Sequence, residues 1–404
     1  MEHKTKESVM LIFDRMWVED ATIDGFLGDK AANAIVLCPQ EYQTRCGKVK
    51  QVIGFDNYLF NDDVEKKALD IGEKYNVTTV IATHEFDLVR AGRVRDALGV
   101  DGQTELSATA YRDKLQMKNY IRKAGLKTAS FFPLSNNFPI SYASKLLKAP
   151  LVIKPRWGAG SKDVKIIRND DDLFTWDEQN ESFSNFMTEE YMDHHMYHVD
   201  GLKVADQIFG LTVSKYVGSC LDVKSGHSLG SIQLRSDSQL FQKAKDHIMQ
   251  VISALPSPAV TPFHLEIFIN SDEDIIFSEI ASRVAGGNID QIVKLKNNID
   301  LINTWIRYQF NKDLSDLSEI KESKDVFGLI IFPPRMGKLK KIATECNHPN
   351  IVKYVVKNKV GDDFNLIRSS ADCIAYAIFK GKDENELENT LQDINKWFYD
   401  NLLI

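Results

Sequence analysis

Two glutamates are the residues best suited to chemistry in this sequence, because a predicted hairpin sets them opposite each other. Apolar runs with strand character, 263–269 and 275–280, flank a polar cluster, 271–274, with the composition of a tight turn. A turn centred between the second and third residues of that cluster places Glu266 directly opposite Glu279.

Carboxylates paired in this way have Cβ atoms about 4.5 to 5.5 Å apart and repel each other unless a cation lies between them. Magnesium suits the gap between Glu266 and Glu279, because it binds one or two protein carboxylates and takes its other ligands from water and phosphate. The alternative is an edge hairpin whose glutamates face water.

A glycine-rich loop is predicted between two apolar strands in the segment 151–167. It contains Gly158, Gly160 and Ser161, whose backbone N–H groups can approach and surround phosphate oxygens. Lys154, in the first strand, can reach the same charge. A Walker A loop or a dinucleotide-binding fingerprint would need a helix after the glycines, whereas here the chain returns as a strand. The pattern therefore favours a flexible hairpin flap over phosphates, with a hairpin that binds no ligand as the alternative.

An anion site is expected directly after the glutamate hairpin. Asn288 is the predicted N-cap of the next helix, and free N–H groups at a helix start bind anions. Gly286 and Gly287 allow the backbone to approach a ligand, and Arg283 adds a planar cation.

The first hundred residues must position a further acidic group, Glu85. They alternate strand and helix signals, which argues for a parallel sheet with helices on its faces. Ligands bind beyond the carboxyl ends of such strands, and Glu85 follows the strand 78–82. Glu85 is therefore a candidate substrate group, and capping of the following helix is the alternative.

The rest of the chain supplies supporting elements. A helix is predicted over 111–124, with Lys114 in its first turn. A Lys-, Glu- and Ser-rich stretch from 313 to 324 has the composition of a linker. Beyond it the pattern predicts four strands and a closing amphipathic helix, at 326–332, 338–342, 352–356, 373–379 and 384–402.

Size and charge limit the function classes. The 404 residues are enough for two to four domains, and a net charge of −7 disfavours a nucleic-acid partner. The first apolar run, 9–13, is too short for a signal peptide or a membrane span, so we expect a cytoplasmic protein without a membrane partner. The five cysteines form no CxxC pair, and His194, His195 and His198 have no fixed companion ligand, so a zinc site is disfavoured.

The order of these features resembles the ATP-grasp superfamily of carboxylate-amine ligases, over about residues 110–310. The shared features are a lysine at a helix start, a strand lysine before a glycine hairpin, an acidic-hydrophobic connector, a hairpin with two glutamates and an arginine four residues later. The preceding sheet resembles the domain that usually precedes the ATP-grasp domain.

The resemblance implies a role for each motif. Lys114 and Lys154 would hold the ATP phosphates beneath the flap of Gly158, Gly160 and Ser161. The hinge would read adenine through backbone groups, and it comprises Glu189, Glu190, Tyr191 and Met192. Glu266 and Glu279 would carry magnesium, with manganese as a second option, and Arg283 would act as the catalytic residue that stabilises the acyl-phosphate and tetrahedral states.

Two positions depart from the pattern of the superfamily. Met196 stands where many members have a glutamate that binds ribose, and Ala281 stands where many have an asparagine that binds metal. These departures leave the ribose contacts and the number of metal ions open.

Within the superfamily, the motifs YRDKLQMK, EEYM with YHVDG, and FSEIASRVAGG resemble those of the L-amino-acid ligases, which form dipeptides. The resemblance implies an α/β fold with an N-terminal parallel domain (1–109), an ATP-grasp domain (110–312) and a small C-terminal domain (313–404). It also implies amino acids as substrates, with L-arginine as acyl donor in antibiotic biosynthesis.

In that reading Arg283, Gly286, Gly287 and Asn288 hold the donor carboxylate, while Glu85 and His227 line the amino-acid pocket. A homodimer is left open. The alternatives are a ligase for a carboxylate other than an amino acid, an ATP-binding sensor without catalysis, and phosphotransfer through a histidine such as His194, His195 or His198.

Overall fold

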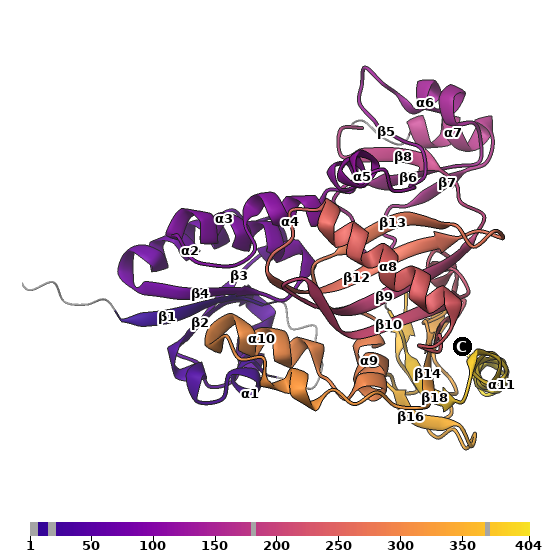
Figure 1. Cartoon of the computed structure of the whole chain (residues 1–404). Coiled ribbons are helices and arrows are strands. Elements are labelled where there is room, and N and C mark those ends of the chain that lie inside the picture. Colours follow the sequence, from indigo (N-terminus) through magenta and orange to yellow (C-terminus); the bar gives the residue numbers. More distant parts are fainter. Residues whose placement is uncertain (1–6, 15–21, 179–182, 368–371) are drawn as a thin grey trace, which may run out of the picture.

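The N-terminal part is a parallel sheet with helices on both faces (Figure 1). The computed structural model describes residues 7–14, 22–178, 183–367 and 372–404. The strand order is β3-β2-β1-β4, and every neighbouring pair is parallel, which confirms the predicted sheet. Its strands are β1 (Ser8–Phe13), β2 (Ala34–Pro39), β3 (Gln51–Phe55) and β4 (Asn76–Ala82).

Alternating side chains of β1 pack against helices on opposite faces of this sheet. Leu11 and Phe13 belong to the same apolar core as residues of α2 (Asp63–Lys74) and α3 (Leu88–Leu98). Met10 and Ile12 belong instead to the core shared with α1 (Ile23–Leu27) and α10 (Leu301–Asn311). The sheet is thus buried on both faces, as its near-continuous apolar strands indicate.

A break in the predicted helix 111–124 sets the position of Lys114. The structure has α4 (Glu105–Arg112) and α5 (Lys114–Lys123), separated by Asp113 in an extended conformation. The Asp113 carboxylate accepts a hydrogen bond from the Leu115 amide, so this residue ends one helix and caps the next. Lys114 is therefore the first residue of α5.

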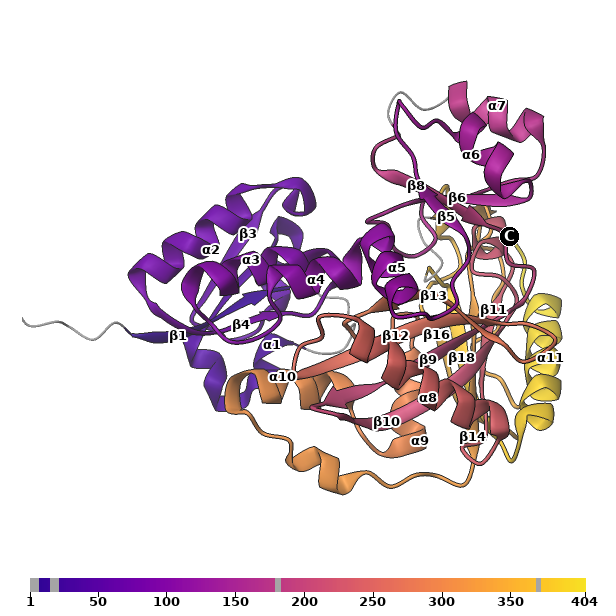
Figure 2. The ribbon, with the colours of Figure 1, turned by 45° about the horizontal axis from the view of Figure 1, so that its top comes forward.

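The glycine-rich loop belongs to a small lobe that projects from the molecule in both ribbon views (Figures 1 and 2). Its four-stranded sheet has the order β5-β8-β6-β7, and β6 and β7 form the predicted antiparallel hairpin. The lobe contains β5 (Phe131–Pro133), α6 (Ile140–Leu147), β6 (Leu151–Pro155), β7 (Lys165–Ile167), α7 (Asp170–Glu178) and β8 (Phe186–Glu190).

The main sheet is antiparallel, with the order β13-β12-β9-β10-β11-β14-β18-β16. Helices α8 (Gln239–Ala254), α9 (Ile289–Asn297) and α11 (Glu384–Asp400) pack against it. The strands are β9 (His195–Val204), β10 (Gln207–Val217), β11 (Leu229–Gln233), β12 (Val260–Ile269), β13 (Ile275–Ala281), β14 (Val326–Phe332), β16 (Ile351–Val356) and β18 (Ala375–Gly381).

The segment predicted as a third domain, 313–404, shares this sheet with the second. Strand β14 pairs with β11 through the register Ser231↔Leu329, so the sheet continues across residue 312. The predicted strand 338–342 is wrong beyond β15 (Gly337–Lys338), which pairs with β17 (Asp363–Phe364). The Leu339 amide donates to the carbonyl of Asp362, and the amides of Lys340 and Lys341 donate to the carbonyl of Leu403 near the end of the chain.

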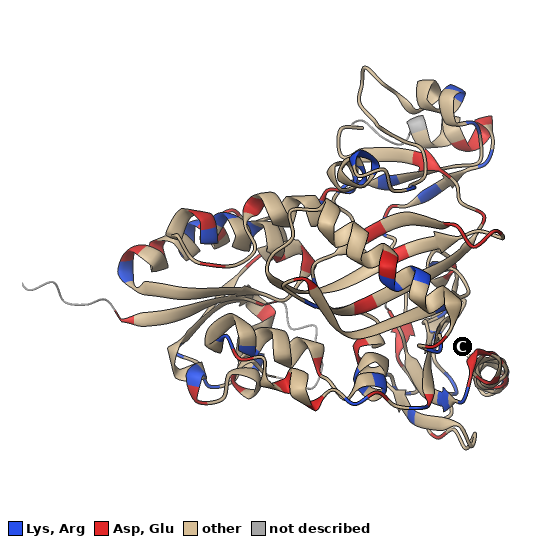
Figure 3. Ribbon diagram, in the orientation of Figure 1, with Lys and Arg blue, Asp and Glu red and all other residues tan. Residues whose placement is uncertain are grey.

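Basic and acidic segments are interspersed along the described parts of the chain (Figure 3). Within those parts, none of the helices combines the length and the apolar character that crossing a membrane would require.

A histidine on the buried face of α8 gives the fold a pH dependence. Burial lowers the pKa of His247 to about 4, and its unfolded-state pKa is about 6.5. Between these values the unfolded chain binds more protons, so stability is full above pH about 6.5 and declines as the pH falls toward 4. We expect His247→Leu to remove this part of the decline, which is about 2 kcal/mol between pH 7.5 and pH 4.5. Denaturant unfolding of both proteins at both pH values measures it, and identical declines would contradict it.

Candidate active site

A cavity of about 470 Å³ brings together residues of the N-terminal domain, the small lobe and the main sheet. Nearly all of the predicted site residues line it. They are Glu85, Lys114, Lys154, Gly158, Gly160, Ser161, Glu189, Glu190, Tyr191, Met192, Glu266, Glu279, Arg283, Gly286 and Gly287. His227 and Asn288 are not among the lining residues.

The two glutamates of the hairpin face each other as predicted, through the register Glu266↔Glu279. The turn differs from the prediction, because the strand residues next to it pair one step out, as Ile267↔Phe277. Ser278 is the extra residue of a β-bulge between these two pairs, and it restores the predicted register at the glutamates. The confirmed pairing thus depends on a bulge that the sequence did not reveal.

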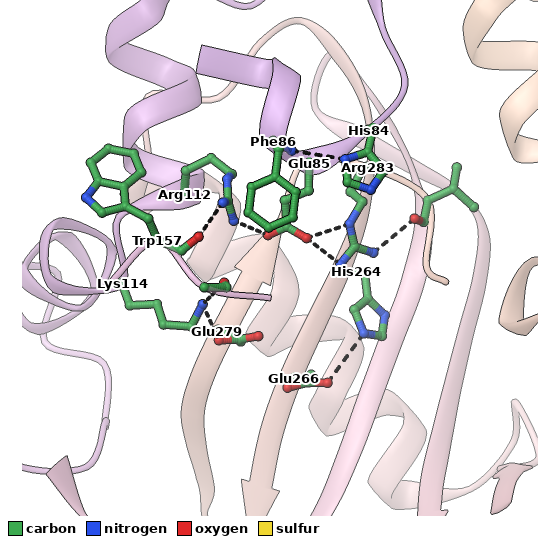
Figure 4. Close-up of polar contacts among 12 residues, drawn as sticks. His84, Glu85, Phe86, Arg112, Lys114, Trp157, His264, Glu266, Glu279 and Arg283 are labelled. Carbon is green, nitrogen blue, oxygen red and sulfur yellow. Dashed lines mark hydrogen bonds and ion pairs between the residues drawn. The ribbon is translucent and has the colours of Figure 1, made fainter. Parts of the chain in front are cut away.

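Both carboxylates have partners inside the cavity (Figure 4). The Lys114 ammonium lies 3.1 Å from the Glu279 carboxylate. The Tyr216 hydroxyl donates to Glu266 at 3.3 Å, and His264 Nε2 lies 3.5 Å from the same carboxylate. Side chains therefore offset part of the repulsion that was expected to require a metal. The oxygen-only, cavity-facing pair is still the ligand chemistry that magnesium or manganese prefers.

A buried chain of hydrogen-bonded polar groups ends at Glu266, and it was not predicted from the sequence. Both oxygens of Asp200 bind histidine Nδ1 atoms, His198 at 2.5 Å and His264 at 2.8 Å, and His198 Nε2 lies 2.7 Å from the Ser231 hydroxyl. Burial lowers the pKa of His264, but the Asp200 and Glu266 carboxylates outweigh it and raise that pKa to about 9. The available signal was the alternation His198-x-Asp200 and His264-x-Glu266, which puts each pair on one face of a strand.

The three histidines that were candidates for a zinc site or for phosphotransfer lie in different environments. His194 and His195 are exposed at the start of β9, whereas His198 is fully buried against Asp200. The three side chains therefore do not form one site.

Lysines from two other elements hold the glycine-rich loop. The Lys114 ammonium donates to the carbonyl of Gly158 at 2.7 Å. The Lys224 ammonium, from the turn after β10, donates to the carbonyl of Ser161 at 2.8 Å. Gly160 and Ser161 both have positive φ, 61° and 55°, which allows the tight turn and is costly only for the serine.

The strand lysine has a partner that the sequence did not indicate. Lys154 lies 2.5 Å from one oxygen of Glu189, and the other oxygen lies 3.0 Å from Lys118 on α5. Burial raises the pKa of Glu189, but the two ammonium groups outweigh it and lower that pKa to about 2. The side chain of the first hinge residue is therefore an internal ion-pair partner.

Two of the hinge amides are already used by the sheet of the lobe. Glu190 donates its amide to the carbonyl of Ser130, and Tyr191 donates to Pro150. Met192, one residue later, lines the cavity beyond the end of β8.

Arg283, which follows β13 of the main sheet, contacts Glu85 of the N-terminal domain (Figure 4). The Arg283 guanidinium donates to one oxygen of Glu85 at 2.8 and 2.7 Å, and Arg112 donates to the other oxygen. Burial raises the pKa of Glu85, but Arg283 and Arg112 outweigh it and hold that pKa well below its usual range. Glu85 thus positions Arg283 in this structure, and its direct contact with a substrate ammonium stays a prediction.

The predicted anion site is only partly assembled. Gly286 and Gly287 line the cavity, and a Cβ atom at either would meet nothing within 4 Å. Asn288 precedes α9 as predicted, but its side chain does not cap the helix and accepts a hydrogen bond from Gln291 instead, because its backbone is left-handed with φ at 67°. His227 is exposed in the loop before β11 and is not among the lining residues, so its place in the amino-acid pocket stays a prediction.

The pair between Glu85 and two guanidinium groups generates a stability prediction. Glu85→Gln leaves the buried Arg112 and the half-buried Arg283 without their carboxylate, and we expect a loss of about 3 kcal/mol of unfolding free energy. Glu65→Gln is the matched control, since Glu65 pairs with Arg93 at the surface and should lose less than about 1 kcal/mol. Denaturant unfolding at pH 7 measures both, and equal losses would contradict the positioning role of Glu85.

Comparisons with known proteins bear on the fold and on the resemblance of the whole chain. No protein-family model matches the chain. An L-arginine-specific L-amino acid ligase from Bacillus subtilis is 24% identical over 332 residues, which cover 79% of either chain.

Solved structures extend the likeness to nearly the whole chain. An L-amino acid ligase from Bacillus licheniformis has a TM-score of 0.77 at 15% identity, covering 99% of this chain and 98% of that one. N5-carboxyaminoimidazole synthetase from Staphylococcus aureus, solved with ADP, has a TM-score of 0.65 at 17% identity, covering 97% of both chains. The chain therefore has the ATP-grasp fold, and the comparisons confirm its predicted resemblance to the carboxylate-amine ligases of that superfamily.

Proposed function

We propose that this protein joins two L-amino acids into a dipeptide in an ATP-dependent reaction that passes through an acyl phosphate and releases ADP and phosphate. The observation that carries the proposal is that Lys114 and Lys154, two opposed carboxylates and Arg283 line the same cavity. A site that only sensed ATP would need the lysines and the hinge, but would have no use for the carboxylates or Arg283.

Nucleotide binding is assigned to the small lobe and α5. Since the amides of Glu190 and Tyr191 are used within the lobe, the Met192 amide is our donor for adenine. Lys114 and Lys154 would hold the phosphates, and Lys114 would exchange the Gly158 carbonyl for a phosphate oxygen. Gly158, Gly160 and Ser161 would then close over the triphosphate.

Glu266 and Glu279 would hold magnesium, or manganese in its place. When bound there, such an ion would offset the charge of the transferring phosphoryl group. The fit rests on two opposed carboxylates whose other neighbours, Lys114 and His264, leave them facing the cavity.

The donor carboxylate needs activation because its oxygen is a poor leaving group. In the first step a carboxylate oxygen attacks the γ-phosphorus, an O–P bond forms and ADP leaves. In the second step the acceptor amine attacks the acyl carbon, the C–O bond to phosphate breaks and the amine loses a proton. Arg283 and the amides around Gly286 and Gly287 would hold the acyl oxygen on which negative charge develops.

The identity of the donor is the finer part of the proposal. L-arginine is our first candidate, supported by the name of the Bacillus subtilis relative. A role in antibiotic biosynthesis and a cytoplasmic location would go with that donor, and a homodimer stays a prediction. A ligase for a different carboxylate is the second candidate.

A phosphate-release screen tests the function. Single amino acids and all pairs are incubated with the protein, ATP and magnesium. We expect more phosphate with pairs than with either member alone, since a single amino acid supports turnover only where it serves as both donor and acceptor, and pairs that contain arginine should be among the best. Release with no amino acid, or release that no second amino acid increases, would contradict dipeptide ligation.

The carboxylate pair generates a second test. Glu279→Gln keeps the shape of the side chain and removes one charge, and we expect turnover to fall about a hundredfold or more, as for other losses of transition-state electrostatics. Titration of the protein with manganese, followed by electron paramagnetic resonance, should show weaker binding in the variant. Unchanged turnover at saturating magnesium would reject the assignment of the hairpin.

A third test separates binding from catalysis at Arg283. Arg283→Lys keeps the charge but loses the planar fork that donates twice to Glu85, so we expect kcat to fall by about tenfold or more with ATP affinity retained. Collapse of ATP affinity together with kcat would make Arg283 a nucleotide-binding or structural residue.

A further inference from the structure

Lys118 is a fully buried lysine one turn beyond Lys114 on α5. Its ammonium lies 3.0 Å from Glu189 and donates to the Thr128 hydroxyl at 3.0 Å. The ring centroid of Phe277 lies 5.7 Å from the same nitrogen. Lys118 is not among the residues that line the cavity, whereas Glu189 and Lys154 are. It is thus a buried cation directly behind the nucleotide-binding residues.

One carboxylate serves two lysines here. Glu189 Oε1 lies 2.5 Å from Lys154 and Oε2 lies 3.0 Å from Lys118, and the exposed fraction of Glu189 is 5%. The group of three carries a net charge of +1. A buried charge without a partner is costly, so this carboxylate needs at least one of the two ammonium groups at all times.

Nucleotide binding would give the Lys154 ammonium a second anionic partner besides Glu189. If Lys154 moves toward the phosphates of ATP, its hold on Glu189 weakens. Glu189 would then be a buried carboxylate close to a triphosphate, and the two negative charges would repel each other. A second cation on the far side of the carboxylate removes this conflict.

We propose that Lys118 is a positioning residue for nucleotide binding, which retains the Glu189 carboxylate and so frees Lys154 for the phosphates. The inference rests on the proposed binding of ATP and deepens it. A purely structural role, in which the three charges only join α5 to the lobe, would predict a loss of stability with no selective effect on phosphate-bearing ligands.

The test compares Lys118→Met, Glu189→Gln and the double variant. Isothermal titration measures the affinity of each for ATP with magnesium, and competition against ATP measures the affinity for adenosine. We expect Lys118→Met to weaken ATP at least tenfold and adenosine less than about threefold, because only the phosphates meet the unbalanced carboxylate. The double variant should bind ATP within about threefold of Glu189→Gln, since Lys118 has no carboxylate to retain there.

Two results would overturn the role of Lys118. One is ATP affinity in Lys118→Met equal to that of the wild type. The other is equal weakening of ATP and adenosine, which would show distortion of the hinge. If the wild-type chain binds no ATP, the proposed function fails first, so the two failures are distinguishable.

A milder variant covers the case in which Lys118→Met does not fold. Thr128→Val removes the hydroxyl that accepts from Lys118, and Thr128→Ser keeps it. We expect Thr128→Val to weaken ATP about threefold with adenosine unchanged, and Thr128→Ser to match the wild type. No difference between these two variants would also contradict the proposal.

Discussion

Three carboxylates of this cavity form ion pairs with lysines and arginines, most of which come from another part of the chain. Glu85 of the N-terminal domain binds Arg112 and Arg283, Glu189 of the lobe binds Lys118 and Lys154, and Glu279 of the hairpin binds Lys114. Since an unpaired buried charge is costly, these pairs fix how the three parts of the molecule face one another. The same charges are suited to a ligand that brings its own anions and metal ion, because several of the pairs can be exchanged for phosphate oxygens.

The β-bulge at Ser278 shows how local backbone geometry serves this constraint. Without the extra residue, the register next to the turn would continue and Glu266 would lie opposite Ser278. A shift of one residue also turns a side chain to the other face of a sheet. The bulge therefore places both carboxylates on the cavity side, where Lys114 and His264 approach them.

Much of this arrangement could be predicted from sequence, because periodicity and turn composition report local structure. The parallel N-terminal sheet, the glycine hairpin and the pairing of Glu266 with Glu279 all follow from such patterns. The ion pairs of Lys118 and Asp200 could not be predicted, since they join segments whose packing is set by the tertiary fold. The exposure of His227 could not be predicted for a related reason: a resemblance carries a position in the chain, but the direction of a side chain depends on the loop that holds it.

The central claim is that ATP activates a carboxylate as an acyl phosphate, and transfer of an oxygen isotope tests it most directly. The donor amino acid is labelled with ¹⁸O in its carboxylate and incubated with the protein, ATP, magnesium and the acceptor, and the phosphate released is analysed by mass spectrometry. Attack of the carboxylate on the γ-phosphorus predicts one ¹⁸O atom in each phosphate formed, with ADP unlabelled. Label in AMP, or phosphate without label while dipeptide accumulates, would contradict the mechanism.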